Sequence, residues 1–134
     1  MPTTVETLTS RVETILDDAT AALARSSERH YADLGPVETR ARLAALLELV
    51  ITSIDQRDLV PVLDHAERIA NDRFDAGFDI REVQCAFHVL EEAIWTQVVA
   101  GTSPDDLVQA IGLVGTVFGA ARDALARTYV SRAS

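Results

Sequence analysis

The chain has 134 residues, of which 48% are hydrophobic and 25% charged, and its formal net charge is −9. That length and composition are typical of one folded domain with a core of its own, and they exclude a disordered segment. The acidic balance argues against a nucleic acid or an anionic membrane as a direct partner, because such binders carry a basic face.

Five helices and no strand are predicted, so residues 1–134 are expected to form one all-α domain, a five-helix bundle. The first helix begins with Thr3 and Glu6 at capping-box spacing and ends near Arg25. Its apolar residues recur at steps of three and four, which predicts one apolar face. They are Val5, Leu8, Val12, Ile15, Ala19 and Ala22. The polar segment 26–34 is predicted to be a loop or a short turn.

The second and third helices have clear start signals. Gly35-Pro36 opens the second, whose residues 43–51 are apolar nearly all round and therefore central. Asp58 is expected to cap the third helix, with Pro61 in its first turn. Gly77 follows the end of that helix, where a left-handed conformation is needed. A second capping box, Asp79 with Glu82, starts the fourth helix at once, so a tight turn is predicted.

The fifth helix contains an unusual set of glycines. Gly101 is expected to end the fourth helix, and Ser103-Pro104 followed by two acids starts the fifth. Gly112, Gly115 and Gly119 then lie inside it, each unfavourable by up to about 1 kcal/mol relative to alanine. They favour close approach of another backbone, either from the same chain or from a second copy.

A mixed stripe on the fourth helix is a candidate surface for a ligand or a partner. Gln84, His88, Glu91 and Trp95 follow one another at steps of four, three and four, so they share a face. A tryptophan anchor is favoured in interfaces, and here it stands beside an amide, a carboxylate and a titratable ring. The alternative is a boundary face on which Trp95 is half-buried and His88 is solvated.

Motifs for catalysis or metal binding are missing from the sequence. There is no nucleophile elbow, phosphate-binding glycine loop or dinucleotide fingerprint, so the chain is not expected to be an enzyme. The single cysteine, Cys85, cannot form an intrachain disulfide, and no Glu-x-x-His pair or paired zinc-ligand spacing occurs. No metal or cofactor is therefore expected. His65 or His88 as the axial ligand of a haem is the alternative, which would make the chain a globin-type haem or small-ligand carrier.

Localisation signals are also missing from the chain. Residues 1–12 have neither the basic start nor the apolar centre of a signal peptide. The most apolar stretch, 107–121, is shorter than the roughly 20 residues that a membrane span needs, and Gln109 interrupts it. The cytoplasm is the expected compartment.

Residues 73–95 carry a pattern that is similar to a known family. The pattern begins with an arginine and a glycine turn. A helix start of the form apolar-x-Glu-Val comes next, followed by an alanine and then by an aliphatic residue and a tryptophan at the end. These residues are Arg73, Gly77, Ile80, Glu82, Val83, Ala86, Ile94 and Trp95. The pattern resembles the N-terminal domain of the RsbR-type (RsbRD) co-antagonists of the kinase RsbT, a domain related to one found in PucR-like transcription factors. A looser likeness extends from Tyr31 to Ile54, and it weakens over the first and fifth helices.

This resemblance implies a globin-like helical fold without haem, usually dimeric, that serves as the sensory module of a stress-response regulator. Arg73 then joins the stripe as part of the ligand or partner surface. Family members typically carry a C-terminal phosphoacceptor or DNA-binding domain, which this sequence does not include. The sequence leaves open whether the chain is a piece of a larger regulator or a free-standing sensor.

The resulting hypothesis is a non-enzymatic regulatory domain that forms a homodimer and binds a regulatory protein or a signal. A purely structural dimerisation module is a further alternative. The apolar face of the first helix must be buried, and a terminal helix can bury it against a twin as readily as against its own core. The expected dimer interface comprises Val5, Leu8, Val12, Ile15, Gly112, Gly115 and Gly119.

Overall fold

Helices make up nearly all of the computed structural model, which describes residues 3–26 and 28–134. They are α1 (Thr4–Ser10), α2 (Val12–Arg25), α3 (Arg29–Leu34), α4 (Pro36–Gln56), α5 (Val60–Asp75), α6 (Ile80–Gly101) and α7 (Pro104–Ala133). No strand occurs in these described residues. The all-α class is confirmed, whereas the expected count of five helices is wrong, because two of the predicted boundaries differ. The globin-like arrangement stays a prediction.

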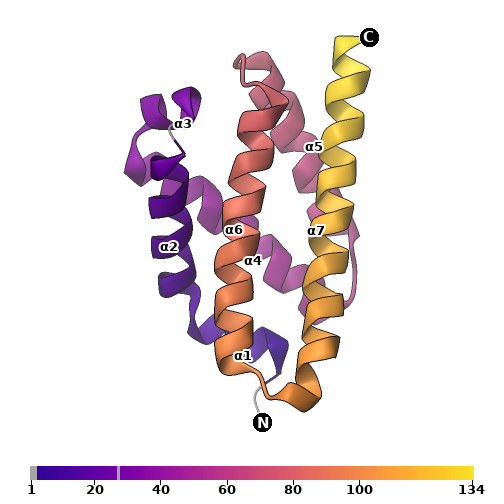
Figure 1. The fold of residues 1–134 in the computed structure, drawn as a ribbon. Helices are drawn as coiled ribbons and strands as arrows, with labels where there is room; N and C mark the ends of the chain where they lie inside the picture. Colours follow the sequence, from indigo (N-terminus) through magenta and orange to yellow (C-terminus); the bar gives the residue numbers. More distant parts are fainter. Residues whose placement is uncertain (1–2, 27) are drawn as a thin grey trace.

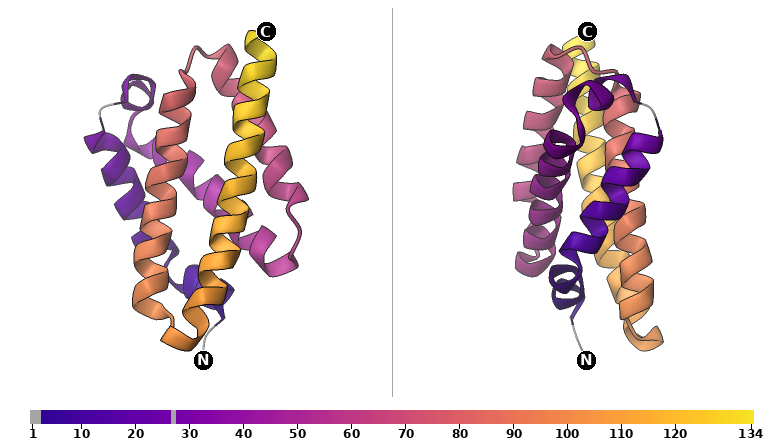
Figure 2. Two further views of the ribbon diagram at one scale, coloured as in Figure 1. Left: turned by 45° about the vertical axis from the view of Figure 1, so that its right-hand side comes forward. Right: turned by 90° about the vertical axis from the view of Figure 1, so that its left-hand side faces the viewer.

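The helices form two layers. α2, α6 and α7 run side by side in one layer, and α4 and α5 form a second layer that covers one face of the first (Figures 1 and 2). The most extensive packing joins α5 to α7 and α2 to α6. α1 covers the end of the molecule near the N-terminus, and α3 lies at the opposite end (Figure 1). None of the described helices is long and apolar enough to cross a membrane.

One continuous core fills the space between the layers. Its fully buried large side chains come from every helix except α3, and Phe87 of α6 and Phe118 of α7 are the largest. On α6 the buried residues follow the helical period at Val83, Phe87 and Leu90. α6 lies between α2 and α7, and it packs chiefly against α1, α2 and α7.

The first predicted helix is broken at Arg11. The backbone there leaves the helical region, with φ −119° and ψ 14°, so α1 and α2 are separate helices. Nη1 of Arg11 donates a hydrogen bond to Oε1 of Gln97 on α6 at 2.8 Å. A Cβ at Gly101 would lie 2.9 Å from Nη2 of Arg11. Gly101 is the last residue of α6, as predicted, and its missing side chain leaves room for the guanidinium.

α3 lies within the segment predicted to be a loop. Only Tyr31 of its six residues is buried, so the segment has no apolar periodicity to reveal a helix. Contacts from outside hold it in place. The Thr39 hydroxyl donates to the carbonyl oxygen of Tyr31 at 3.3 Å, and His30 binds a carboxylate of α6, described below.

The turn between α5 and α6 follows the sequence prediction. Gly77 has φ +83°, the left-handed conformation that favours glycine. The N–H of Phe78 donates to the carbonyl of Arg73 at 2.9 Å, which closes the end of α5. Oδ1 of Asp79 accepts from the N–H of Arg81 at 3.0 Å and caps α6. This turn fixes the register of the first residues of α6.

The apolar face of α1 and α2 is buried inside its own chain. Leu8 and Ile15 are fully buried, and α1 and α2 both pack against α4 and α6. Val5 and Val12 are half-buried against the same core. The need to bury this face therefore does not require a contact between copies at these four residues, because the face is already covered within one chain.

Leu8→Ala tests this placement. The variant should lower the free energy of unfolding by about 2–5 kcal/mol, because it removes buried methyl groups and leaves a cavity. Val37→Ala, at a side chain that is 83% exposed, should change it by less than about 0.5 kcal/mol. Urea denaturation gives both values. A folded Leu8→Ala protein of wild-type stability that has lost its dimer would instead place Leu8 between two copies.

Candidate functional site

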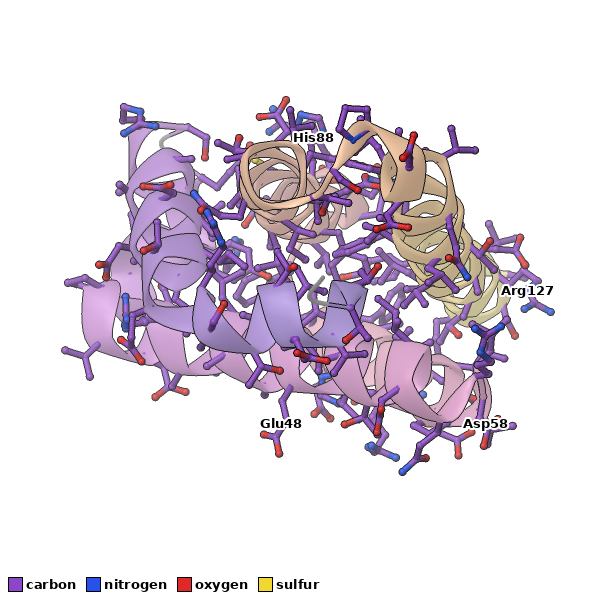
Figure 3. The ribbon with its side chains drawn as sticks, turned by 90° about the horizontal axis from the view of Figure 1, so that it is seen from below. Glu48, Asp58, His88 and Arg127 are labelled. Atoms are coloured by element: carbon purple, nitrogen blue, oxygen red, sulfur yellow. The ribbon has the colours of Figure 1, made fainter. Side chains whose placement is uncertain are left out.

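The mixed stripe on α6 is divided between solvent and the protein's own packing. Gln84 and His88 are exposed, whereas Glu91 and Trp95 are half-buried. His88 projects from the face opposite to Glu48 of α4 (Figure 3). Its Nε2 lies 3.0 Å from Oε1 of Glu92, one turn further along the helix. The outer part of the stripe is accessible to a partner at Gln84 and His88.

The inner part of the stripe joins α6 to α7. Arg122 of α7 donates a hydrogen bond to the carboxylate of Glu91, whose side chain is 14% exposed. The same guanidinium lies over the ring of Phe118, 5.9 Å from its centre. Trp95 packs against the core. Glu91 is therefore already neutralised, and a partner would meet it only through its pair with Arg122.

Arg73 lies apart from the stripe. It helps to line a small cavity of about 20 Å³ with Tyr31 and with Ala86 of α6. Ala86 follows Gln84 by two residues, which turns it about 200° around the helix from the stripe. The structure therefore does not bring Arg73 together with Gln84 and His88. Its guanidinium instead lies 5.6 Å from the centre of the Phe78 ring, and its Nε is buried without a hydrogen-bond partner among the described residues.

Phe78, in the turn between α5 and α6, is the centre of an aromatic cluster that sequence reasoning missed. The centre of its ring lies 4.6 Å from that of His30 and 5.1 Å from that of Tyr31, which meets it edge-on. The hydroxyl of Tyr129 on α7 donates to the Phe78 carbonyl oxygen at 3.0 Å. We call His30, Tyr31, Phe78, Glu82 and Tyr129 the Phe78 cluster. It joins α3, α6 and α7, which are far apart in the sequence.

Glu82 corrects the predicted capping box. Asp79 caps α6 as expected, but Glu82 does not reach back to it. The side chain of Glu82 is buried, and its two oxygens lie 2.9 and 2.8 Å from Nδ1 of His30. The backbone N–H of His30 also donates to it at 3.3 Å. A buried carboxylate requires such donors, so this contact holds α3 against α6. The cue in the sequence was that Glu82 lies next to the apolar Val83.

Burial keeps both tyrosines of the cluster protonated. It raises the pKa of Tyr129 to about 12. Burial also raises the pKa of Tyr31 from its ordinary value, although the neighbouring Arg73 opposes the shift. Both hydroxyls therefore remain donors at neutral pH, and the bond from Tyr129 to Phe78 is retained.

The two histidines considered as haem ligands differ in surroundings. His88 is exposed, as described above. Burial lowers the pKa of His65 on α5, and Arg68 and Arg73 lower it further, so its ring is neutral at pH 7. Its Nε2 is buried, and no residue in the part of the chain that the structure describes forms a hydrogen bond with it. No group of three or more His, Cys, Asp or Glu side chains among residues 3–26 and 28–134 is placed to hold a metal ion.

A mostly apolar cavity of about 230 Å³ lies beside the Phe78 cluster. The residues that line it include Tyr31 of α3, Thr20 and Leu23 of α2, and Thr39 of α4. Tyr31 therefore contributes both to this cavity and to the aromatic cluster.

The glycines of α7 lie on its solvent side. Gly112, Gly115 and Gly119 are exposed, and a Cβ built on any of them would meet no atom within 4 Å. Val108 and Ile111 beside them are exposed as well. The interpretation that these glycines serve close packing within one chain is therefore wrong.

Comparison with known proteins gives one match. The family model described as the RsbT co-antagonist protein rsbRD N-terminal domain matches residues 13–133. No curated protein and no solved structure matches the chain. The match extends from α2 through α7, further than the resemblance over residues 31–95, and it includes the glycine-containing helix.

Removal of the Tyr129 hydroxyl should change how stability depends on pH. A tyrosine with a raised pKa in the folded state stabilises the fold fully below pH 10, and this contribution is lost as the pH rises towards 12. Tyr129→Phe should lower the free energy of unfolding at pH 8 by about 1–3 kcal/mol, because the Phe78 carbonyl loses its donor. It should also flatten the fall between pH 10 and 12.

The sequence contains no lysine, but burial raises the pKa of Tyr31 as well, so the difference between the wild type and Tyr129→Phe is what isolates the contribution of Tyr129. Urea denaturation at pH 8 and pH 11 measures the stability, and tyrosinate absorbance follows the ionisation. Tyrosinate formation that is complete in the folded protein near pH 10 would contradict the assignment.

Trp95→Ala separates packing from surface function on the stripe. Because Trp95 packs against the core, we expect the variant to lose about 3 kcal/mol of stability. His88→Ala, at the exposed end of the stripe, should stay within about 0.5 kcal/mol of the wild type. Thermal melting measures both. An unchanged melting temperature for Trp95→Ala would make Trp95 a free surface anchor.

Proposed function

The chain belongs to the RsbT co-antagonist protein rsbRD N-terminal domain family, and from this premise we propose that it is a non-enzymatic regulatory domain of a bacterial stress response. In this proposal the domain acts in the cytoplasm as a homodimer and binds a regulatory protein. The family itself is one of regulatory co-antagonist domains, which supports a role in association rather than in catalysis.

The observation that carries the proposal is the exposed glycine face of α7. Gly112, Gly115 and Gly119 stand inside a helix of 30 residues, where each lowers helix stability by up to about 1 kcal/mol relative to alanine. No atom of the same chain uses the space that they leave. A second helix can approach such a face closely, and the packing between the two helices would offset the loss.

The same face has the composition of a contact between two copies. Val108 is 78% exposed and Ile111 is 44% exposed, so the glycines are flanked by unburied apolar side chains. In a two-fold dimer this patch meets itself, and each favourable interaction occurs twice. We therefore place the dimer contact on α7, and not on the buried face of α1 and α2.

The α6 stripe lies next to this face and is the proposed surface for a regulatory partner. Arg122 follows Gly119 by three residues, so it continues the glycine face, and it binds Glu91 of α6. Gln84 and His88, further along the stripe, are exposed. A partner that contacts the stripe would thus lie beside the dimer helix, which supports a regulatory coupling between the two surfaces.

Gly115→Arg tests the dimer. Because the glycine face meets itself, the variant places two guanidinium groups and two long side chains in one contact, and it should convert a dimer into a folded monomer. Gln109→Arg is the matched control. Gln109 lies on the same helix about 120° around from Gly115, and its neighbours in a groove include Glu6 and Asp106, which favour an added cation. It should remain dimeric.

Light scattering at micromolar concentration measures the mass, and circular dichroism shows that the variants are folded. Gly115→Ala adds a second measurement. A Cβ there meets nothing in the chain, so the isolated fold should gain up to about 1 kcal/mol while the dimer weakens. A wild type that stays monomeric at high concentration, or a Gly115→Arg protein that stays dimeric, would refute the α7 contact.

A further inference from the structure

The small cavity beside Arg73 is lined by residues of four helices, α3, α4, α5 and α6. Its volume is about 20 Å³. A cavity needs roughly 10–15 Å³ to hold one water molecule. It therefore has room for one particle of about that size, which is either a water molecule or a monatomic ion.

The polar residues that line this cavity supply mainly hydrogen-bond donors. They are Tyr31 of α3, Arg42 of α4 and Arg73 of α5. A guanidinium has five N–H donors and no acceptor, and the Tyr31 hydroxyl stays protonated at neutral pH. A water molecule would find only the Tyr31 oxygen as an acceptor for its two hydrogens. An anion accepts without donating, so it fits this set of donors better.

Neither guanidinium is saturated by carboxylates. Arg73 forms no ion pair with the described residues, although the chain has 21 acidic side chains and only 12 basic ones. Arg42 binds Glu38 through Nε at 3.1 Å, and its terminal nitrogens form no hydrogen bond within residues 3–26 and 28–134. The Glu38 side chain is 54% exposed, so water weakens its hold on Arg42.

The positive potential of both guanidiniums reaches the wall of the cavity. Burial raises the pKa of Tyr31, whereas Arg73 and then Arg42 lower it. Glu82 acts in the opposite direction with the smallest effect, and its carboxylate is bound by His30. The field at the Tyr31 hydroxyl therefore favours a negative charge.

The rest of the wall selects which anion can enter. It is apolar, and Leu43, Leu46 and Phe87 in it are buried. An ion that enters must give up its water, and this loss is least unfavourable for a weakly hydrated anion. Sulfate, phosphate and carboxylates have several heavy atoms and exceed the available volume.

We propose that the cavity between Tyr31, Arg42 and Arg73 binds a single halide ion, with chloride as its natural occupant. The ion accepts hydrogen bonds from the terminal guanidinium nitrogens and from the tyrosine hydroxyl, and it thereby holds α3, α4 and α5 together. The Tyr31 ring also meets Phe78 edge-on, so loss of the ion loosens the Phe78 cluster. This site does not depend on the proposed function.

Thermal melting in chloride and in fluoride tests the proposal at equal ionic strength. Fluoride has the same charge but is more strongly hydrated. Replacement of fluoride by chloride should raise the melting temperature of the wild type by about 3–6 °C, because a ligand of the folded state stabilises that state. General salt effects act in the opposite direction, since strongly hydrated anions are excluded from protein surfaces and favour the folded state.

Chlorine NMR measures the binding directly. The wild-type protein should broaden the chloride line, and added bromide should reverse the broadening by competing for the same site. Sulfate at the same ionic strength should leave it unchanged, because sulfate is too large for the cavity.

Three variants locate the ion. Arg73→Gln removes one donor group with its charge and should lose both the chloride-dependent rise in melting temperature and the line broadening. Arg68→Gln makes the same charge change at an exposed position of α5 that does not line the cavity, and it should respond like the wild type. Ala86→Val fills the cavity and leaves both guanidiniums in place, so it should also lose the response. If Arg73→Gln fails to fold, Arg42→Gln replaces it.

Four results would overturn the proposal. They are a wild type that melts no higher in chloride than in fluoride, a folded Arg73→Gln or Ala86→Val protein that keeps the chloride response, an Arg68→Gln protein that loses it, and displacement of chloride by sulfate. The last two would place the ion on the protein surface rather than in the cavity.

Discussion

The buried carboxylate of Glu82 is the constraint on which one end of the molecule depends. The left-handed Gly77 and the Asp79 cap start α6 in a register that turns Glu82 inwards. Away from water the carboxylate must have donors, and α3 supplies them through the ring and the backbone N–H of His30. Loss of one partner of such a pair leaves an uncompensated buried charge, which is unfavourable by about 3–5 kcal/mol.

The position of α3 therefore depends on its contact with α6 and not on the local sequence of its six residues alone. Once the pair with Glu82 is formed, Tyr31 on the next position contacts Phe78 on one side and the cavity on the other. Phe78 in turn holds Tyr129 of α7. Elements that are far apart in the sequence are thus joined through one turn. α7 binds this turn through Tyr129 and also carries the exposed glycine face.

Features that depend on neighbours in the sequence were predictable, and those that depend on distant contacts were not. The turn at Gly77, the cap at Asp79 and the start of α7 follow from three or four consecutive residues. The break at Arg11 and the burial of Glu82 depend on partners that are 86 and 52 residues away along the chain. The spacing of the α6 stripe predicts a single face, but its division by the Glu91–Arg122 pair requires the position of α7.

The distribution of charge supports the proposal that two copies meet at the α7 face. Each copy carries a formal charge of −9, so most approaches bring carboxylates together. Along the glycine face the residues from Val108 to Gly119 are uncharged, and Arg122, which follows them, is neutralised by Glu91. Repulsion between the remaining carboxylates acts from further away, and salt screens it over about 8 Å at physiological ionic strength. The uncharged face thus permits close contact, while the acidic surface around it disfavours other pairings between copies.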